Sequence, residues 1–429
     1  MKRPYVPLLC LVVVFIVFGG VCRTSLGAGI VHLLYNGHGQ AYWDYMHDVA
    51  KSFQEQNPDV SIEIIICAHD KVYVMLGAGV PLDVIDLPDF GYLSLTGTFL
   101  DMMPSMKRDN LERHYHQEII DQMKAPDGGL YTLPFSIAPQ HTIYNRDLFR
   151  ARGVATPDEL GENWTWDTVL AAGRKLTYDK DGDGIVDVYG IDRAMSMWQS
   201  GTHQAGGKFY DNPYLPTKSL WTSDPVRKAV EFVGTIFREG LCPHFRVSNF
   251  REYMIYVGGS AMVFVDSSGT IGAYPDFLDY DFDFYLQPKG PMYRAALSQP
   301  QGPHILATTT DPELTWQWVK FWAVDRENVR DWMRRTLRVP LLRELQRSYA
   351  EASGFINKNW AAVFQQALEP NPYYYVFLPD TLDPRKISFD VVWRGLATPE
   401  DHLEEIHQNA TRAIEEWHAA LEKRDFLRQ

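Results

Sequence analysis

Between residues 29 and 87, short continuous apolar runs alternate with segments in which apolar residues recur at helical spacing. This alternation constrains the fold more than any other feature of the chain. The apolar runs predict buried strands and the stretches between them predict helices: strands at 29–35, 60–66 and 83–87, helices at 42–56 and 72–76. Consecutive strands that are connected through helices usually pair in parallel, with the helices covering the sheet. The beginning of the chain therefore predicts an α/β fold.

The remainder of the chain continues as a mixture of strands and helices without an internal repeat. The predicted strands are 131–135, 142–145, 260–265 and 282–286. The predicted helices are one that opens within 164–167, with Thr165 or Asp167 as a possible cap, and 226–239, 314–322, 327–337 and 402–421. Residues 136–140 separate the first two of these strands and are interpreted as a crossover. No long linker divides the chain. If it forms two domains, the chain must therefore pass from one domain to the other more than once.

Composition indicates a large globular protein and argues against a nucleic-acid partner. With 429 residues, 45% of them hydrophobic, the chain is too long for one hydrophobic core of ordinary size, so two domains are expected. A formal charge of −13 repels phosphate backbones. Aromatic residues make up 13% of the chain, which fits either a large core or a polar pocket with flat apolar walls, the kind of surface that sugar rings contact.

The N-terminus has the pattern of an export signal. Lys2 and Arg3 precede an apolar run from about residue 5 to 21, and the small residues Gly27 and Ala28 follow. Residues 1–27 are therefore predicted to be a signal peptide. Because the run approaches the length that spans a bilayer, an uncleaved anchor is the alternative, and lipid attachment at Cys22 is another.

Neither the cysteines nor the acidic residues form a recognisable metal motif. Cys67 and Cys242 lie far apart in the sequence and are interpreted as buried free thiols. Asp179, Asp181 and Asp183 alternate with other residues before a glycine, as in a calcium-binding loop, but the twelfth position of such a loop is Gly190 instead of an acidic residue. A tight Asp/Gly turn is favoured, with these aspartates as a weak metal candidate.

Sequence motifs of common enzymes are not found, whereas polar residues follow several predicted strands. The chain has no nucleophile elbow, zinc-protease motif, P-loop or dinucleotide fingerprint, so no catalytic residue and no cofactor is predicted. Open α/β sheets bind ligands beyond the carboxyl ends of their strands. The polar residues at such positions are Asn36, His38, Asp86, Asp89, Ser136 and Gln140, and together they predict a cleft.

Several segments, in this order, resemble the family 1 extracellular solute-binding proteins, which capture substrates for carbohydrate ABC transporters and include the maltodextrin-binding protein. The similar segments are 53–60 (FQEQNPDV), 75–85 (MLGAGVPLDVI), 130–134, 143–149, 166–191 with the Asp/Gly turn, 205–210 (AGGKFY), 259–262, 316–322 and 338–340. The similarity extends over nearly the whole chain after the leader. It depends on the order of the motifs, since none of them is specific alone.

The resemblance implies a periplasmic-binding-protein-like fold of type II, with two α/β lobes joined by a multi-strand hinge that close around the ligand. It predicts one lobe from residues 28–137 and about 280–338, and a second from 138–279 and about 339–429. The implied partners are a carbohydrate and the permease subunits of an ABC importer, and a monomer is expected. The implied location is the periplasm or the outer face of the cytoplasmic membrane.

Transferred to this sequence, the resemblance completes a set of predicted ligand-binding residues. They are Asn36, His38, Asp86, Asp89, Phe90, Ser136, Gln140, Trp198, Gln199, Asp266, Ser268, His304 and Arg338. The chain departs from many sugar-binding relatives at Ser267-Ser268, where those relatives have a tryptophan. A ligand with fewer stacked rings, or a sugar acid that contacts Arg338 or His304, is therefore an open alternative.

Two other classes of protein remain as alternatives. One is a secreted polysaccharide-degrading enzyme, which needs an acid and a base on either side of the scissile bond. The other is a sugar-sensing ectodomain attached to the membrane by a retained leader.

Overall fold

The computed structural model describes residues 28–88, 91–244, 254–266, 280–353, 357–369 and 378–426. The predicted leader, residues 1–27, lies outside this part of the chain. Within the described residues, no helix has both the length and the apolar composition needed to cross a membrane.

The first lobe begins with the predicted alternation of strands and helices, which the structure confirms. β1 (Ala28–Tyr35), α1 (Gln40–Gln56), β2 (Val60–Cys67), α2 (His69–Gly77) and β3 (Val84–Pro88) follow one another. β1 pairs in parallel with β2 on one side and with β3 on the other. The helix α1 buries Tyr42, Tyr45, Met46, Val49 and Phe53, which recur at helical spacing, against the core.

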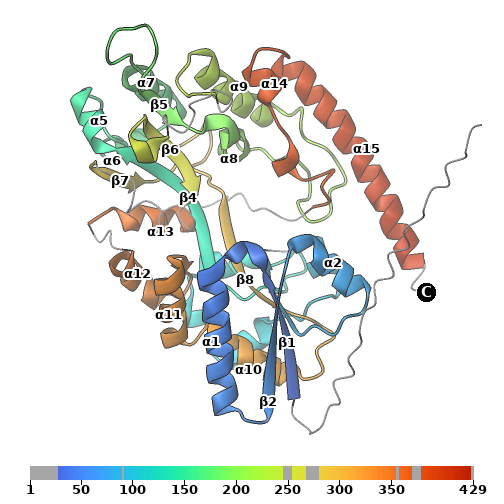
Figure 1. Ribbon diagram of the computed structural model, residues 1–429. Coiled ribbons are helices and arrows are strands. Elements are labelled where there is room, and N and C mark those ends of the chain that lie inside the picture. The colour runs from blue at the N-terminus through green and yellow to red at the C-terminus, as the bar shows by residue number, and fades with distance from the viewer. Residues whose placement is uncertain are drawn as a thin grey trace, which may run out of the picture.

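Two long strands continue the sheet from the first lobe into the second (Figure 1). The sheet order is β2-β1-β3-β8-β4-β6-β5, with β7 and β9 also paired to β4. β8 (Ser298–Ile305) is antiparallel to β3 and β4 (Ser136–Asn145) is antiparallel to β8. The other strands are β5 (Tyr189–Asp192), β6 (Ser260–Asp266), β7 (Phe282–Tyr285) and β9 (Val339–Pro340).

The predicted strand at 131–135 is wrong, and residues 136–140, interpreted as a crossover between two strands, belong with 141–145 to the single strand β4. In the structure Pro139 is the last residue of β4 that pairs with β8, and the pairing with β6 begins at Gln140. The proline lies where the strand changes partners, so β4 remains continuous.

Helices cover both lobes (Figure 1). Those that contribute to the first lobe are α1, α2, α3 (Met103–Arg108), α4 (Gln117–Met123), α10 (Pro312–Ala323), α11 (Arg326–Thr336), α12 (Gln346–Ala352) and α13 (Trp360–Leu368). Those of the second lobe are α5 (Arg146–Ala151), α6 (Pro157–Leu160), α7 (Trp166–Leu176), α8 (Met197–Gln204), α9 (Asp224–Arg238), α14 (Asp390–Trp393) and α15 (Pro399–Phe426). Of the two possible caps, Thr165 is the one that caps α7, accepting a hydrogen bond from the Thr168 amide.

The buried hydrophobic residues form separate cores in the two lobes. The larger core of the first lobe includes Tyr349, Trp360 and Val363 from α12 and α13. The core of the second lobe resumes at Leu378 and ends with the buried stripe of α15. We therefore propose lobe boundaries that assign residues 339–368 to the first lobe, whereas the sequence analysis placed them in the second.

Candidate functional site

A cluster of polar and aromatic side chains lies beyond the carboxyl ends of β1 and β3. The 3-10 turn Asn36–His38 follows β1 and leads into α1, and Asp86 lies near the end of β3. The imidazole of His38 stacks on the ring of Tyr42, with centroids 4.4 Å apart. His38 and Asp86 expose only 4% and 2% of their side chains, while Asn36 is exposed. The turn thus folds one of its polar side chains inward.

Arg338 connects this cluster to the segment that follows α11. Its Nη1 donates to Nδ1 of His38 at 3.0 Å, and Nη2 donates to the His38 carbonyl at 3.4 Å. Because a guanidinium can only donate, Nδ1 of His38 must be the accepting nitrogen and the ring proton must be on Nε2. Nε2 then donates to the Asp86 carbonyl at 3.3 Å. Arg338 therefore fixes both the tautomer and the neutral state of His38.

Burial sets the protonation of the cluster. The pKa of Asp86 is raised to about 6 by desolvation, although the hydroxyl of Tyr42 donates to its carboxylate and Arg338 lies nearby, and both lower it. The pKa of His38 is lowered to about 3 by desolvation and by the charge of Arg338. At neutral pH the cluster therefore holds a buried carboxylate and a neutral imidazole beside one guanidinium.

The raised pKa of Asp86 predicts a pH-dependent effect of Asp86→Asn on stability. The folded pKa of about 6 exceeds the ordinary 3.8, so this group favours folding most below pH 4 and loses that contribution as the pH rises through 6. We expect Asp86→Asn to gain up to about 3 kcal/mol relative to the wild type between pH 4 and 7. Urea unfolding at several pH values measures this difference. A difference that does not change with pH would contradict it.

Residues of the crossing strands lie next to the cluster. Gln301 of β8 accepts a hydrogen bond from Nη1 of Arg338 at 3.4 Å, and it lies opposite Ser136 in the β4–β8 pair. Ser136 also lies opposite Pro340 of β9 and is buried. Gln140 is half-buried farther along β4, opposite Asp266 of β6. The strands thus carry Ser136, Gln140 and Gln301 along the path from one lobe to the other.

Three predicted ligand residues are enclosed by their own lobes. Trp198 is 2% exposed in the second lobe, in contact with the rings of Phe209, Trp221 and Phe389. Gln199, the next residue of α8, is also buried. His304 is 0% exposed, and its Nδ1 lies within hydrogen-bond distance of the Thr132 hydroxyl and the Tyr131 carbonyl. Trp198 and Gln199 both lie within α8, most of whose side chains are buried in the second lobe.

Three other predicted residues belong to segments that the structure does not describe. Asp89, Phe90 and Ser268 lie outside the described residues, and Asp266 is described only by its position in β6. The structure adds Tyr42 and Gln301 to the cluster. Neither is in the set of predicted ligand residues, although the family resemblance aligns the segment 301–304 with the binding site. Tyr42 was assigned to the buried face of its helix, and nothing in its spacing indicated that its hydroxyl reaches Asp86.

The Asp/Gly segment forms a turn that satisfies its own acidic groups. The carboxylate of Asp179 accepts from the amides of Gly182 and Gly184 at 2.6 and 2.7 Å. Carboxylate oxygens of Asp179, Asp181 and Asp187 lie within 4.8 Å of one another, whereas Asp183 is not part of that group. The backbone contacts account for the local structure of the turn, so we place no ligand there.

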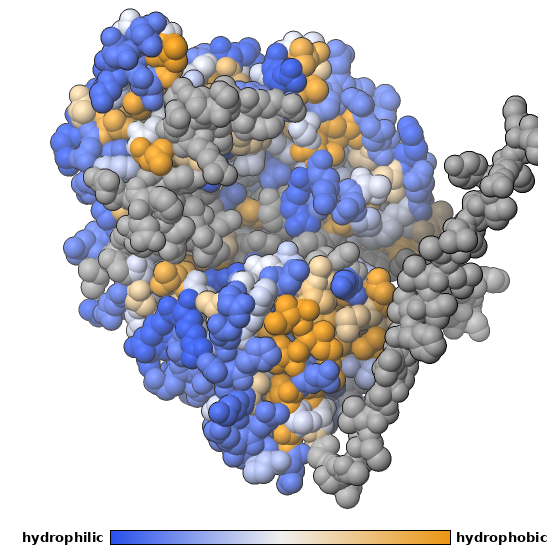
Figure 2. All heavy atoms as spheres, in the orientation of Figure 1, coloured by the Kyte–Doolittle hydropathy of each residue, from blue (hydrophilic) through white to orange (hydrophobic). Residues whose placement is uncertain are grey.

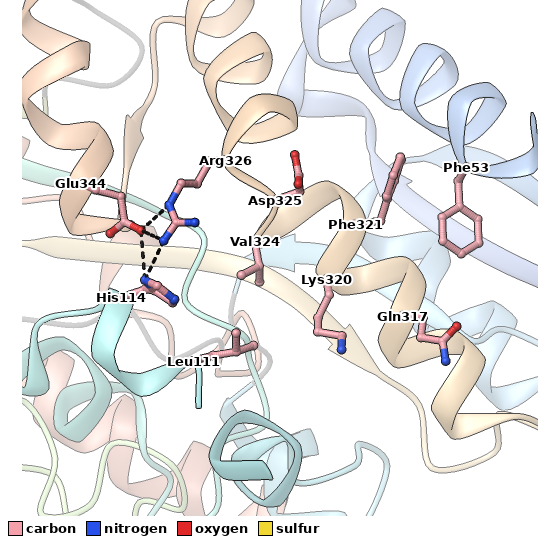
Figure 3. A pocket seen from close by; sticks show the side chains of 10 residues that line it. All are labelled: Phe53, Leu111, His114, Gln317, Lys320, Phe321, Val324, Asp325, Arg326 and Glu344. Carbon is pink, nitrogen blue, oxygen red and sulfur yellow. Dashed lines mark hydrogen bonds and ion pairs between the residues drawn. The ribbon is translucent and has the colours of Figure 1, made fainter. Parts of the chain in front are cut away.

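A pocket of about 390 Å³ lies on the first lobe, between α1, α10 and the start of α11 (Figure 3). Its charged groups contact other groups of the chain: Asp325 caps α11 through two backbone amides, and the others form ion pairs. Glu344 contacts Arg326 at 2.7 Å and His114 at 3.0 Å, and Lys320 pairs with Asp109, which is not among the lining residues. None of the residues of the cluster around His38 lines this pocket, so it is separate from the candidate site.

Comparisons with known proteins identify relatives of the chain. The family model described as bacterial extracellular solute-binding protein matches residues 39–328. Curated relatives from Brucella abortus and Brucella suis are 24% identical over 166 residues, which is 36% of this chain. The aligned stretch spans 37% of the length of these relatives.

Solved structures have the same fold over most of the chain. A substrate-binding protein of an ABC transporter from Listeria monocytogenes, in complex with cycloalternan, has a TM-score of 0.69 at 20% identity and covers 91% of this chain and 99% of its own. UspC of M. tuberculosis has a TM-score of 0.73 at 16% identity and covers 90% and 100%. These likenesses show the predicted type II periplasmic-binding-protein-like fold, and the family match covers most of the chain. The chain therefore belongs to the bacterial extracellular solute-binding proteins.

Proposed function

We propose that this protein captures a saccharide between its two lobes and delivers it intact to the permease subunits of an ABC importer. The observation that carries the proposal is the cluster of His38, Tyr42, Asp86, Gln301 and Arg338, located where β4 and β8 pass between the lobes. Saccharides bind proteins through hydrogen bonds to their hydroxyls and through contact with aromatic faces. The cluster supplies carboxylate, amide and guanidinium groups beside an aromatic ring.

The solved relatives support a saccharide as the ligand. The solved structure of the Listeria protein is a complex with cycloalternan, and that of another relative, CpMnBP1, has mannotriose bound. A saccharide that contacts both lobes would bind the closed arrangement more tightly than the open one, and this difference in affinity would drive closure. The protein would then act without catalysis and without a cofactor, as a monomer outside the cytoplasmic membrane.

The proposed contacts with the saccharide include other predicted residues besides the cluster. These are Asn36, Ser136, Gln140 and Asp266, together with Asp89, Phe90 and Ser268. Trp198 and His304 do not belong to them, because their rings pack against other aromatic rings of their own lobes, whereas Gln199 remains a proposed contact.

A ligand screen by thermal unfolding tests the proposal. A saccharide present at a hundred times its Kd is expected to stabilise the folded protein by about 2.7 kcal/mol, which raises the Tm by several degrees. Mono- to trisaccharides are screened in neutral and uronic forms, and chromatography checks each mixture for hydrolysis. A shift in Tm with the saccharide recovered intact is the expected result. Products that accumulate with time would instead identify a polysaccharide-degrading enzyme, and no shift with any saccharide would contradict the proposal.

A further inference from the structure

The guanidinium of Arg338 is held by neutral groups alone among the described residues. Its hydrogen-bond partners are Nδ1 and the carbonyl of His38 and the side-chain carbonyl of Gln301. The ring of Tyr42 lies 5.6 Å from its central carbon. Other half-buried arginines of the described chain pair with carboxylates: Arg146 with Asp283 at 2.6 Å and Arg385 with Asp383 at 2.5 Å. Within that part of the chain, no carboxylate lies within ion-pair distance of Arg338.

Among the described residues, the hydrogen bonds of Arg338 use one edge of its guanidinium and leave the other without a partner. The group has five N–H donors, two on each terminal nitrogen and one on Nε. Both donors of Nη1 are directed to His38 and Gln301, and one donor of Nη2 is directed to the His38 carbonyl. Because Nη1 and Nη2 bind the same residue, their shared edge faces His38. The remaining donors, on Nε and Nη2, form the edge that binds a carboxylate with two parallel hydrogen bonds.

We propose that Arg338 binds the carboxylate of an acidic saccharide, so that the ligand of this protein is a uronic acid or an oligosaccharide that contains one. This inference rests on the proposed function and narrows it from saccharides to acidic saccharides. Lysine would present a charge without this edge, whereas the planar fork of arginine matches the two oxygens of a carboxylate. The guanidinium of Arg338 is already oriented by His38, Gln301 and Tyr42 in the absence of ligand, which reduces the entropic cost of binding.

Asp86 does not occupy this edge of Arg338. Its carboxylate accepts the hydroxyl of Tyr42 and lies 3.7 Å from Nε2 of His38, on the far side of the imidazole from Arg338. Its side chain is 2% exposed, whereas Arg338 is half-buried and retains contact with solvent. The net charge of the chain, −13, opposes the binding of anions in general. A preference for acidic saccharides would therefore require a specific local cation.

Calorimetric titration with matched saccharides tests the inference. The purified protein is titrated with mono-, di- and trisaccharides of galacturonate and glucuronate, with the neutral galactose and glucose counterparts, and with glucose 6-phosphate. At least one uronic form is expected to bind about tenfold or more tightly than its neutral counterpart, as charged bidentate hydrogen bonds allow. Equal or tighter binding of neutral forms would overturn the inference but leave the proposed function standing. Tighter binding of the phosphate would overturn the assignment to a carboxylate.

Variants assign the effect to Arg338. Arg338→Gln is expected to remove the preference for the uronic form, and Arg338→Lys to retain only part of it because the fork is lost. Arg334→Gln removes the same charge from an exposed position on α11 and should leave the preference unchanged. The Tm of each variant without ligand shows that it is folded. A preference that persists in Arg338→Gln would overturn the role of Arg338, and no binding of any saccharide would contradict the proposed function itself.

Discussion

Replacing Trp198 with alanine is expected to lower the free energy of unfolding by about 3–5 kcal/mol, the usual cost of deleting a buried tryptophan. Its side chain lies between the rings of Phe209, Trp221 and Phe389. These rings come from three separate parts of the second lobe, so they cannot close together over the cavity without moving the backbone. The lost contacts and the remaining cavity both contribute to the cost.

Urea unfolding measures the effect, with Tyr73→Ala as the control. Tyr73 is an aromatic residue of α2 that is 44% exposed. Figure 2 shows that apolar residues reach the surface of the first lobe. Removal of the Tyr73 ring should change stability by less than about 0.5 kcal/mol, as is typical of surface positions. If Trp198→Ala were as stable as Tyr73→Ala, or weakened saccharide binding with no loss of stability, the placement of Trp198 in the core would be incorrect.

Much of the fold can be predicted from local patterns. Each buried strand of an α/β protein is a continuous apolar run, and each helix buries one apolar stripe. The elements from β1 to β3 agree with their predicted ranges to within a few residues. The division of the chain between the lobes depends on long-range contacts instead. The helices α12 and α13 join the first core through Tyr349, Trp360 and Val363, and their own spacing indicates only that they have a buried face.

The candidate site was predictable only where its residues lie at the carboxyl end of a strand. His38 lies in the turn after β1 and Asp86 lies within the last residues of β3, and the pairing of β1 with β3 brings them together. Arg338 was found through the family resemblance, not through spacing. Tyr42 was missed because an aromatic residue at helical spacing is indistinguishable from any other core residue until the position of Asp86 is known. Trp198 illustrates the reverse error, since tryptophan suits both a sugar-binding surface and a core.

Gly302 is the position where an added methyl group should most disturb the strands that connect the lobes. A Cβ atom at this residue of β8 would lie 1.9 Å from the carbonyl oxygen of Leu133 and 3.3 Å from Cβ of Phe135. The Leu133 amide donates to the carbonyl of Pro303, and the Phe135 amide donates to that of Gln301, so this segment is hydrogen-bonded on either side of the glycine. The clash involves backbone atoms that cannot rotate away, and both hydrogen bonds would have to lengthen.

We therefore expect Gly302→Ala to destabilise the protein by about 3 kcal/mol or more, the upper end of the cost of overpacking. Gly77→Ala is the matched control, since Gly77 ends α2 with no atom within 4 Å of the added Cβ, and its substitution should change stability by less than about 1 kcal/mol. Differential scanning calorimetry compares the two variants. Because Gln301 precedes Gly302 and accepts from Arg338, a displaced β8 should also weaken saccharide binding in Gly302→Ala. A Tm equal to that of Gly77→Ala would mean that the segment 133–135 does not pack on β8 as closely as described.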